Sequence, residues 1–255
     1  MRDFKYVYGP VYSWRLGRSL GVDPLSREKK KCNFDCIYCQ VGRTRGYTLS
    51  RRKFAEGKDL LGEVRAALGL GKTDYITLSG SGEPTLALNI GSVIKHLKKL
   101  KDSKVAVITN STMLPDRKVR RELLEADTVL VKLDAFSQGS FKRINRPARG
   151  ITYAAILKGI KQFRKEYGGR LCVQVMFTAE NECHAGEISG KIRELGMDEV
   201  HLNTPLRPCG VKPLSRKKLA DIRKHFRGMK VKTVYDKPAK KVRVISAEAS
   251  GRRGR

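Results

Sequence analysis

Three cysteines gather in one short segment near the start of the chain, and no other residues are better placed to do chemistry. Cys32, Cys36 and Cys39 lie within eight residues, in the run Lys-Cys-Asn-Phe-Asp-Cys-Ile-Tyr-Cys-Gln. A tight loop brings such neighbours to one concave side, where three thiolates can hold three corners of a compact metal centre. A four-iron cluster fits that ligand count, and its fourth iron then stays open to bind a small molecule.

Two simpler interpretations of these cysteines compete with the iron–sulfur one. Cys36 and Cys39 alone could form a redox dithiol or half of a structural zinc site. A closed zinc site needs a fourth ligand, and the nearest histidine, His96, lies far along the chain in a helical pattern. A thiol oxidoreductase has no use for Cys32. We therefore favour the iron–sulfur interpretation over both.

The charge of the chain points to a polyanionic partner. The 255 residues carry 54 Lys and Arg against 25 Asp and Glu, a net charge of +29. The last 50 residues alone hold 17 basic and three acidic side chains. Such a field attracts phosphate backbones independently of their sequence. A heat-adapted surface would carry charges of both signs in balance, so we expect RNA as a partner.

Compartment and membrane association follow from composition. The chain has no apolar run long enough to span a membrane, and its first residues lack the apolar core of a signal peptide. We expect a cytoplasmic protein with no membrane partner. Six cysteines, three of them bunched, are more typical of metal ligands in a reducing compartment than of a disulfide framework.

Strand and helix patterns alternate along most of the chain. Strands are expected at residues 19–23, 74–79, 105–109, 128–135, 171–178 and 199–204, and helical patterns lie between them at 60–68, 90–97, 119–124, 156–163 and 188–195. Repeated strand–helix units predict an α/β protein with parallel strands and outer helices. After residue 206 a helix is expected around Leu219, followed by strand-like runs at 231–235 and 242–245.

Polar residues follow the carboxyl ends of these strands, which form one face of a parallel barrel. The cysteine loop follows the first strand, and polar residues follow or close the other five; these are Gly80–Pro84, Asn110, Asp134, Glu180 with Asn181, and Asn203. The chemistry is therefore expected at that face. Lys132 and Asp134 alternate along one strand, so their side chains share a side and can pair there.

The cysteine spacing, with Tyr38 just before the last cysteine, resembles that of the radical S-adenosylmethionine superfamily. Five further segments, in the same order, resemble its stand-alone wyosine-synthetase-like branch: Tyr8–Pro10, Arg15–Asp23, Ser79–Thr85, Phe141–Pro147 and Leu202–Pro208. The resemblance covers about residues 4 to 215. It implies a partial (β/α)6 barrel over residues 1–215, with residues 216–255 as a basic extension packed on the barrel or trailing from it.

The resemblance also implies the cofactors and their ligands. Cys32, Cys36 and Cys39 are expected to bind a [4Fe-4S] cluster whose open iron holds S-adenosylmethionine. An external low-potential donor, such as a ferredoxin or flavodoxin, supplies the electron, since no second cluster motif is visible. The residues expected to contact S-adenosylmethionine are Tyr38, Gly80, Gly82, Glu83, Asn110, Lys132, Asp134 and Asn203.

Two departures from the family's pattern concern this cofactor site. The usual double glycine is here Gly80-Ser81-Gly82, which the branch shares, and Lys132 stands where related sequences often carry a small polar residue. For Asn110 and Tyr38 the alternatives are a strand-ending turn and ordinary packing. Arg143 and Arg146 are candidates for carboxylate or phosphate contact, and exposed loop arginines are the alternative.

Three cysteines lie outside the loop. Cys183 and Cys209 follow the fifth and sixth expected strands, so both should lie at the active face, where a thiol can give a hydrogen atom, carry a methyl group or bind a metal. The alternative is a structural role for both. Cys172 begins its strand and should pack as a small apolar residue at the opposite end.

The expected function is reductive cleavage of S-adenosylmethionine to methionine and a 5'-deoxyadenosyl radical, which then modifies a substrate. A tRNA or other RNA nucleoside is the first hypothesis for that substrate. True wyosine synthases carry further cysteines upstream, and this chain has none before Cys32, so that ring closure is not predicted. The alternatives are a protein- or peptide-modifying enzyme such as a glycyl-radical activase, and an RNA-binding module with a purely structural cluster.

Overall fold

The computed structural model describes residues 4–25, 29–100 and 103–236. The expected strand at 242–245 and residues 237–255 of the basic extension lie outside these described residues.

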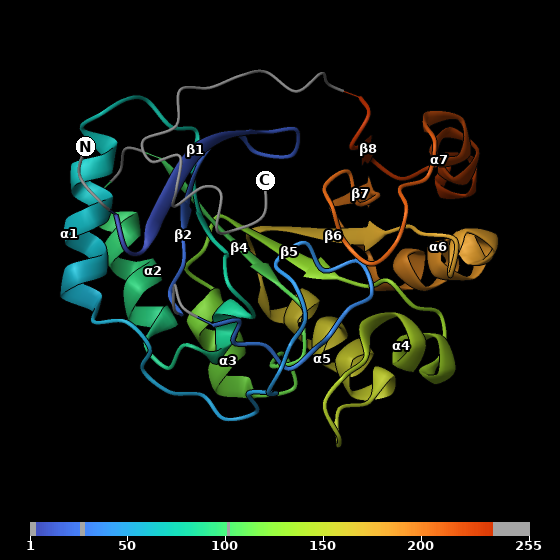
Figure 1. Cartoon of the computed structure of the whole chain (residues 1–255), viewed down its shortest axis with the longest axis horizontal. Coiled ribbons are helices and arrows are strands. Elements are labelled where there is room, and N and C mark those ends of the chain that lie inside the picture. The colour runs from blue at the N-terminus through green and yellow to red at the C-terminus, as the bar shows by residue number, and fades with distance from the viewer. Residues whose placement is uncertain (1–3, 26–28, 101–102, 237–255) are drawn as a thin grey trace.

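A single curved sheet of eight strands organises the described chain (Figure 1). In spatial order its strands are β1 (Val7–Ser13), β2 (Gly17–Val22), β3 (Tyr75–Leu78), β4 (Lys104–Thr109), β5 (Thr128–Lys132), β6 (Arg170–Met176), β7 (Glu199–Asn203) and β8 (Val231–Thr233). β1 is antiparallel to β2, and all later neighbours are parallel. The six expected parallel strands and the partial barrel are confirmed.

Helices cover the outer side of this sheet, as the repeated strand–helix units predict. They are α1 (Gly57–Leu68), α2 (Ile90–Lys99), α3 (Arg117–Leu123), α4 (Gln138–Asn145), α5 (Tyr153–Glu166), α6 (Ala185–Leu195) and α7 (Arg216–Arg223), with short 3-10 turns η1 (Pro84–Leu86), η2 (Glu182–His184) and η3 (Lys224–Phe226). α4 has no counterpart among the expected helices. It follows β5, so two helices instead of one separate β5 from β6.

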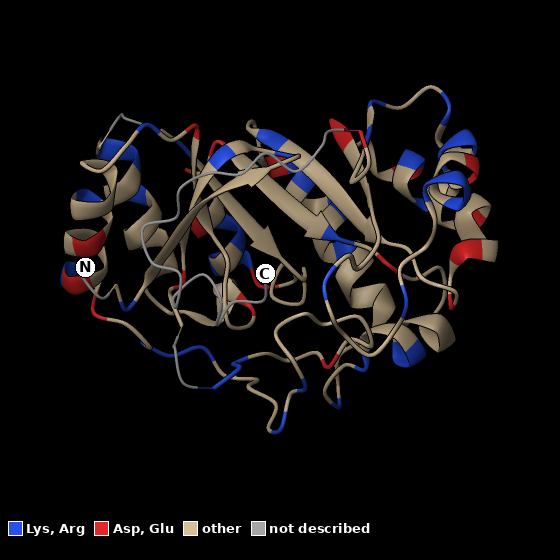
Figure 2. Cartoon of the chain, turned by 45° about the horizontal axis from the view of Figure 1, so that its top comes forward, with Lys and Arg blue, Asp and Glu red and all other residues tan. Residues whose placement is uncertain are grey.

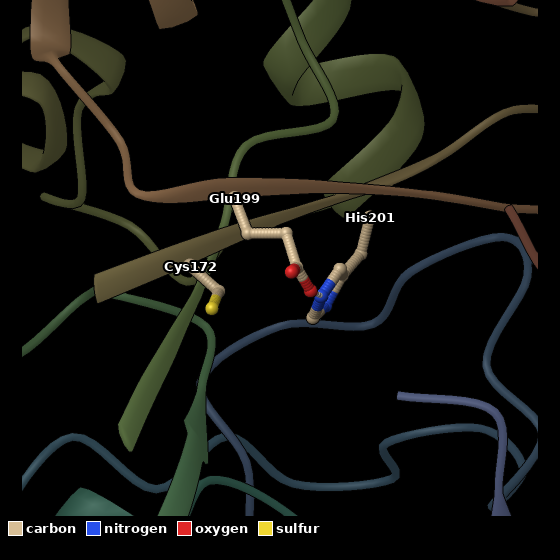
Figure 3. A group of neighbouring side chains, drawn as sticks. All are labelled: Cys172, Glu199 and His201. Carbon is tan, nitrogen blue, oxygen red and sulfur yellow. Dashed lines mark hydrogen bonds and ion pairs between the residues drawn. The ribbon is translucent and has the colours of Figure 1, made fainter. Parts of the chain in front are cut away.

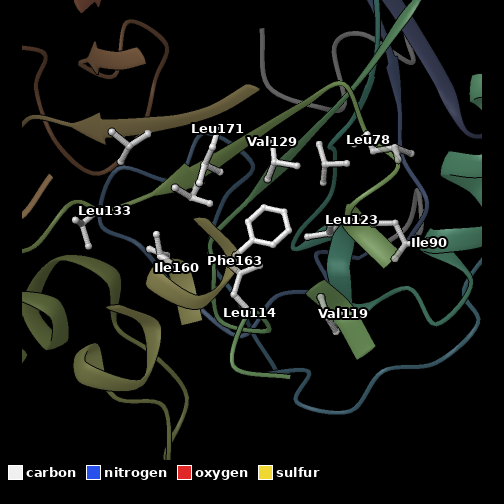
Figure 4. Close-up of a cluster of buried hydrophobic side chains, with 14 of the residues drawn as sticks. Leu78, Ile90, Leu114, Val119, Leu123, Val129, Leu133, Ile160, Phe163 and Leu171 are labelled. Atoms are coloured by element: carbon white, nitrogen blue, oxygen red, sulfur yellow. The ribbon is translucent and has the colours of Figure 1, made fainter. Parts of the chain in front are cut away.

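The main core lies between the sheet and these helices (Figure 4). Val129 and Leu171 point outward from the strands and meet Phe163 of α5, which is fully buried. Burying such a side chain contributes about 1.5–3 kcal/mol. Alternate residues of each strand therefore face the helices, and the residues between them face the inside of the barrel.

The inside of the barrel is closed at one end by the turn between β1 and β2. The hydroxyl of Ser13 accepts hydrogen bonds from the backbone N–H groups of Arg15, at 3.3 Å, and Leu16, at 3.2 Å, which fixes the turn. Leu16 packs against Ala106, Leu130 and Cys172 from the inner faces of β4, β5 and β6. This second, smaller core lies at the end of the barrel away from the cysteine loop.

The segment after residue 215 continues the sheet. β8 pairs with the edge of β7, and the ring of Phe226 in η3 lies 6.2 Å from that of Phe177, which follows β6. Lys and Arg recur along α7 and along the loops at the lower edge of Figure 2. Among the described residues, none of the helices has both the length and the apolar character that crossing a bilayer requires.

Candidate metal centre and cofactor site

The cysteine loop lies between two segments from distant parts of the chain. On one side Lys31 pairs with Gly82: Lys31 N–H donates to Ser81 O at 2.8 Å, and Glu83 N–H donates to Lys31 O at 2.9 Å. On the other side Phe34 pairs with Pro147, just after α4. Both edges of the loop are thus fixed by backbone hydrogen bonds, which positions its thiols between β3 and α4.

The three thiols fit a metal centre better than a set of packed neutral side chains. All three are free; Cys32 is buried, and Cys36 and Cys39 are half-buried. Amide N–H groups point at two sulfurs, from Asn110 to Cys32 at 3.8 Å and from Asn145 to Cys36 at 3.5 Å. Such donors stabilise thiolates, which bind iron. Burial raises the pKa of Cys32 to about 12 and that of Cys36 to about 11, so a bound cation is needed to hold them deprotonated.

A buried carboxylate beyond the end of β5 fixes the loop from inside the barrel. Asp134 accepts hydrogen bonds from the hydroxyl of Tyr38, from Asn145 Nδ2 at 2.9 Å and from the backbone N–H of Met176 at 2.7 Å. Lys132 Nζ lies 3.4 Å from Asp134 Oδ1 and 4.9 Å from the centre of the Tyr38 ring. The pairing of Lys132 with Asp134 that the strand alternation allows is therefore present, and it includes Tyr38.

Glycines at positions 80 and 82 allow the loop to approach the end of β3. Both have positive φ, 148° and 150°. A Cβ at Gly82 would lie 1.6 Å from Lys31 O, and one at Gly80 would lie 2.4 Å from the carboxyl carbon of Asp23. No side chain fits either place. The two glycines therefore let the Asp23 carboxyl and the Lys31 carbonyl pack directly against this backbone, at the mouth of the barrel where the sequence predicts the amino-acid end of the cofactor.

Glu83 and Asn110 are engaged in holding the neighbouring strand ends. Glu83 is 1% exposed and accepts hydrogen bonds from Thr85, from the Thr109 hydroxyl at 2.7 Å and from Asn110 N–H at 2.6 Å. Burial raises the pKa of this carboxyl. The Asn110 side chain donates to Asn33 Oδ1 at 2.7 Å. In the described structure both side chains join β3, β4 and the cysteine loop to one another.

The remaining expected site residues are not all brought together. Asn203 ends β7, and its backbone carbonyl accepts a hydrogen bond from Phe177 N–H at 2.7 Å. Cys209 packs against a small cluster beside Tyr38 and Cys36, and its thiol lies 3.3 Å from Val211 O. Cys183 is exposed on η2, apart from that cluster and from the pocket at the cysteine loop.

The pocket at the cysteine loop has a volume of about 940 Å³. Cys36, Cys39 and Cys209 all line it. Its charged lining residues are four basic side chains and one acidic one: Arg43, Lys142, Arg143, Arg146 and Glu180. The pocket thus joins the thiols to a strongly positive wall, and both arginines singled out in the sequence are part of that wall.

Asn145 is the functional candidate that sequence reasoning missed. It begins the Asn-Arg-Pro run, between the two candidate arginines Arg143 and Arg146, and its amide contacts Cys36, Tyr38 and Asp134. Pro147 disfavours helical backbone at the preceding residue, and Arg146 ends α4 with φ 44°. The signal that could have found Asn145 is its place in the last turn of a helix that must stop there.

A second buried group of potential metal ligands does not form a convincing metal site. Cys172, Glu199 and His201 offer ligand atoms within 4.8 Å of one another (Figure 3). His201 Nε2 lies 2.5 Å from Glu199 Oε1, and that oxygen is also 3.0 Å from Lys232 Nζ. Arg170 pairs with the other carboxylate oxygen at 2.5 Å. Lys232 and Arg170 already neutralise the carboxylate of Glu199, so the group is better explained as a salt-bridge network with His201 hydrogen-bonded to it.

Comparisons with known proteins agree with this geometry. The family model described as the radical SAM superfamily matches residues 30–189, so the chain belongs to the radical SAM superfamily. Its cofactors are therefore a [4Fe-4S] cluster and S-adenosylmethionine. Over 252 residues the chain is 41% identical to a UPF0026 protein of Synechocystis, covering 96% of this chain and 89% of that protein. Within the superfamily the chain thus belongs to the UPF0026 family.

Solved structures share its fold at low sequence identity. A structure of TYW1 with a lysine-pyruvate adduct bound has a TM-score of 0.65 at 18% identity and covers 82% of this chain and 72% of that one. A structure of native anSMEcpe with bound AdoMet has a TM-score of 0.64 at 18% identity, with 85% and 64% covered. These likenesses concern the fold.

Proposed function

We propose that this radical SAM enzyme modifies a nucleoside within an RNA, tRNA in the first place. The observation that carries the proposal is the positive pocket at the cysteine loop. Four basic side chains and one acidic side chain line it, and it reaches Cys36 and Cys39. A phosphate backbone lying along such a wall brings a nucleoside to the thiols. The net charge of +29 supports the same partner.

Within this proposal each group of residues has a distinct task. Cys32, Cys36 and Cys39 ligate the cluster, and Asn110 and Asn145 donate N–H groups toward two of their sulfurs. The backbone at residues 80–82 receives the amino-acid end of S-adenosylmethionine, and residues around Asp134, Lys132 and Asn203 adjoin the rest of it. When bound, the cluster supplies the electron that cleaves the sulfonium bond. An external ferredoxin or flavodoxin provides that electron, in a cytoplasmic setting.

The direct test is mass spectrometry of nucleosides from total tRNA and from rRNA of cells with and without the gene. We expect one modified nucleoside to disappear in the deletion strain. Plasmid-borne wild-type gene should restore it, and a Cys36→Ala gene should not. An unchanged nucleoside profile would refute the RNA proposal and direct attention to a protein or peptide substrate.

RNA binding in vitro gives a second, independent test. Lys142→Gln with Arg143→Gln removes two charges from the pocket wall, and Lys95→Gln with Lys99→Gln removes two charges from α2 as a matched control. Removing one ion pair with a phosphate lowers the slope of log affinity against log salt by about 0.7–0.9. We expect this slope to fall by about 1.4–1.8 for the pocket pair, which removes two such ion pairs, and to stay unchanged for the α2 pair. Equal falls would show that the pocket has no special part in binding.

A further inference from the structure

The concave side of the sheet carries a row of polar side chains at one level of the barrel. Lys132 of β5 lies opposite Gln174 of β6, Gln174 lies opposite His201 of β7, and His201 lies opposite Lys232 of β8. Their strand neighbours Val131, Val173, Val200 and Leu202 belong to the core under the helices. The row therefore faces the inside of the barrel.

The row lies between the plugged end of the barrel and the cysteine loop. Two residues before the row along the strands, Leu130 and Cys172 pack on Leu16 of the β1–β2 turn, which closes that end of the barrel. Two residues after it, Asp134 contacts Tyr38 of the cysteine loop. A strand rises about 3.3 Å per residue, so the row is about 7 Å from each of these levels. A molecule held at the row would lie within its own length of the cofactor site.

The turn between β1 and β2 also supplies side chains beside the row. The ring of Trp14 lies 5.5 Å from that of His201, edge to face. The guanidinium of Arg15 lies 4.7 Å from the centre of the Trp14 ring. Arg15, Gln174 and His201 are thus gathered in one region of the barrel interior, which we call the inner chamber.

The inner chamber collects buried polar atoms that have no partner. Within the described part of the chain, five buried side-chain atoms lack a hydrogen bond, and four of them are Nε and Nη1 of Arg15, Oε1 of Gln174 and Nδ1 of His201. Gln174 is 5% exposed and His201 is 1% exposed. Leaving each such group unsatisfied costs about 1–3 kcal/mol. Three neighbouring side chains that bear this cost together indicate a ligand that satisfies them.

The charges in the chamber define what that ligand must present. The Glu199 carboxylate accepts a hydrogen bond from the Nε2–H group of His201 at 2.5 Å. Burial lowers the pKa of His201 to about 4. His201 is therefore neutral, with the Nδ1 lone pair free to accept a hydrogen bond. Burial and the nearby Arg207 guanidinium lower the pKa of Arg15 to about 10. At neutral pH Arg15 stays cationic and offers donors, which suit an oxyanion.

We propose that the inner chamber binds the reacting part of the substrate, with an oxyanion at Arg15 and N–H or O–H groups at His201 Nδ1 and Gln174 Oε1. The inference rests on the proposed function only in the identity of the substrate. For an RNA substrate the oxyanion is a phosphate of the target nucleotide, and the donors belong to its base or ribose. A free molecule carrying a carboxylate would meet the same groups.

Calorimetric titration of the anaerobically reconstituted enzyme tests the proposal at one fixed salt concentration. The probes are the four nucleoside 5'-monophosphates, inorganic phosphate, and acetate and succinate as phosphate-free carboxylates. Arg15→Met removes the charged donors, and Arg18→Met removes an exposed arginine from the same hairpin as a control. Because hydrogen bonds to a charged group are strong, Arg15→Met should lower the affinity for the bound probe about tenfold or more. Arg18→Met should bind that probe as the wild type does.

Gln174→Met separates the two halves of the site. It should weaken nucleotide binding about threefold to tenfold and leave inorganic phosphate unaffected, because the base or ribose of a nucleotide reaches this position, whereas inorganic phosphate is held at Arg15. Gln174 Oε1 and the Nε and Nη1 atoms of Arg15 have no hydrogen bond to lose, and Met can still pack on the Trp14 ring in place of the guanidinium. In the absence of probe, both variants should therefore melt close to the wild-type temperature. A purely structural arginine would instead show a clear loss of stability.

The outcomes distinguish this inference from the RNA proposal. Failure of every oxyanion probe to bind, or binding that Arg15→Met leaves unchanged, overturns the inner chamber and leaves the RNA proposal to its own nucleoside test. Binding of carboxylates alone, abolished by Arg15→Met, supports the chamber and counts against an RNA substrate. Binding of a nucleotide that depends on Arg15 and Gln174 supports both.

Discussion

Gly82→Ala should detach the cysteine loop without unfolding the barrel. An added Cβ would lie 1.6 Å from the carbonyl oxygen of Lys31 and 2.4 Å from its carbonyl carbon, whereas real Cβ contacts are essentially never under 3.0 Å. Lys31 must therefore move by roughly 1.4 Å or more. That movement breaks its hydrogen bonds to Ser81 O and from Glu83 N–H, at 2.8 and 2.9 Å.

The magnitude follows from these contacts. Each backbone hydrogen bond contributes about 0.5–1.5 kcal/mol, and alanine held at φ 150° adds strain of about 1–3 kcal/mol. A cost of about 2–6 kcal/mol falls on the loop. The chain avoids most of it by letting the loop leave β3, which also displaces Cys32. We therefore expect little change in the melting temperature and a large loss of cluster.

Iron and sulfide content after anaerobic reconstitution, followed by S-adenosylmethionine cleavage, is the appropriate assay. Gly62→Ala is the matched control, because a Cβ at Gly62 in α1 meets no atom within 4 Å and alanine favours the helix by up to about 1 kcal/mol. The control should retain full iron content and gain slight stability. Gly82→Ala with full iron content and normal cleavage would refute the steric role of Gly82 in seating the loop.

Three further changes test other parts of the site. Tyr38→Phe removes the hydroxyl that donates to buried Asp134 and should lower the free energy of unfolding by about 1.5–3 kcal/mol, measured by urea titration; a change under about 0.5 kcal/mol would contradict this. Cys209→Ser should slow product formation more than Cys183→Ser, because only the former lines the pocket, with equal rates as the contrary result. His201 has its pKa lowered from 6.5 to about 4 by burial, so the unfolded chain binds its proton first and stability should fall as pH drops from 6.5 to 4; His201→Gln should flatten that loss, and an unchanged pH profile would show that His201 is not its source.

Much of the fold could be predicted from the sequence because buried parallel strands and amphipathic helices leave a clear periodic signal. Lys132 and Asp134 share a side of the sheet for the same reason, and their ion pair is present at 3.4 Å. Periodicity also indicates which end of each strand carries chemistry. The sequence therefore placed the cysteine loop and the glycines at residues 80–82 correctly relative to the strands.

The positions of Cys183, Cys209 and the β1–β2 turn could not be predicted, because they depend on the path that a loop takes after its strand ends. Cys183 and Cys209 both follow strands, but Cys183 enters η2 and α6 at once, whereas the longer loop of Cys209 returns over the cysteine loop and joins it through Arg207 and Gln40 at 2.8 Å. The β1–β2 turn likewise folds into the barrel with no periodic signal. Only tertiary packing decides such paths, and no spacing in the sequence encodes them.

The arrangement of the cysteine loop has a consequence for the timing of its maturation in the cell. The thiols lie near the start of the chain, yet Asp134, Asn145 and Arg207, which hold the loop, come 96 to 167 residues after their partners. Ribosomes add about 5–20 residues per second. Roughly 10–30 s therefore pass between the synthesis of the thiols and that of the residues that hold the cysteine loop in place. Until then the thiols are open to oxidation and to the wrong metal, so iron delivery must follow completion of the barrel.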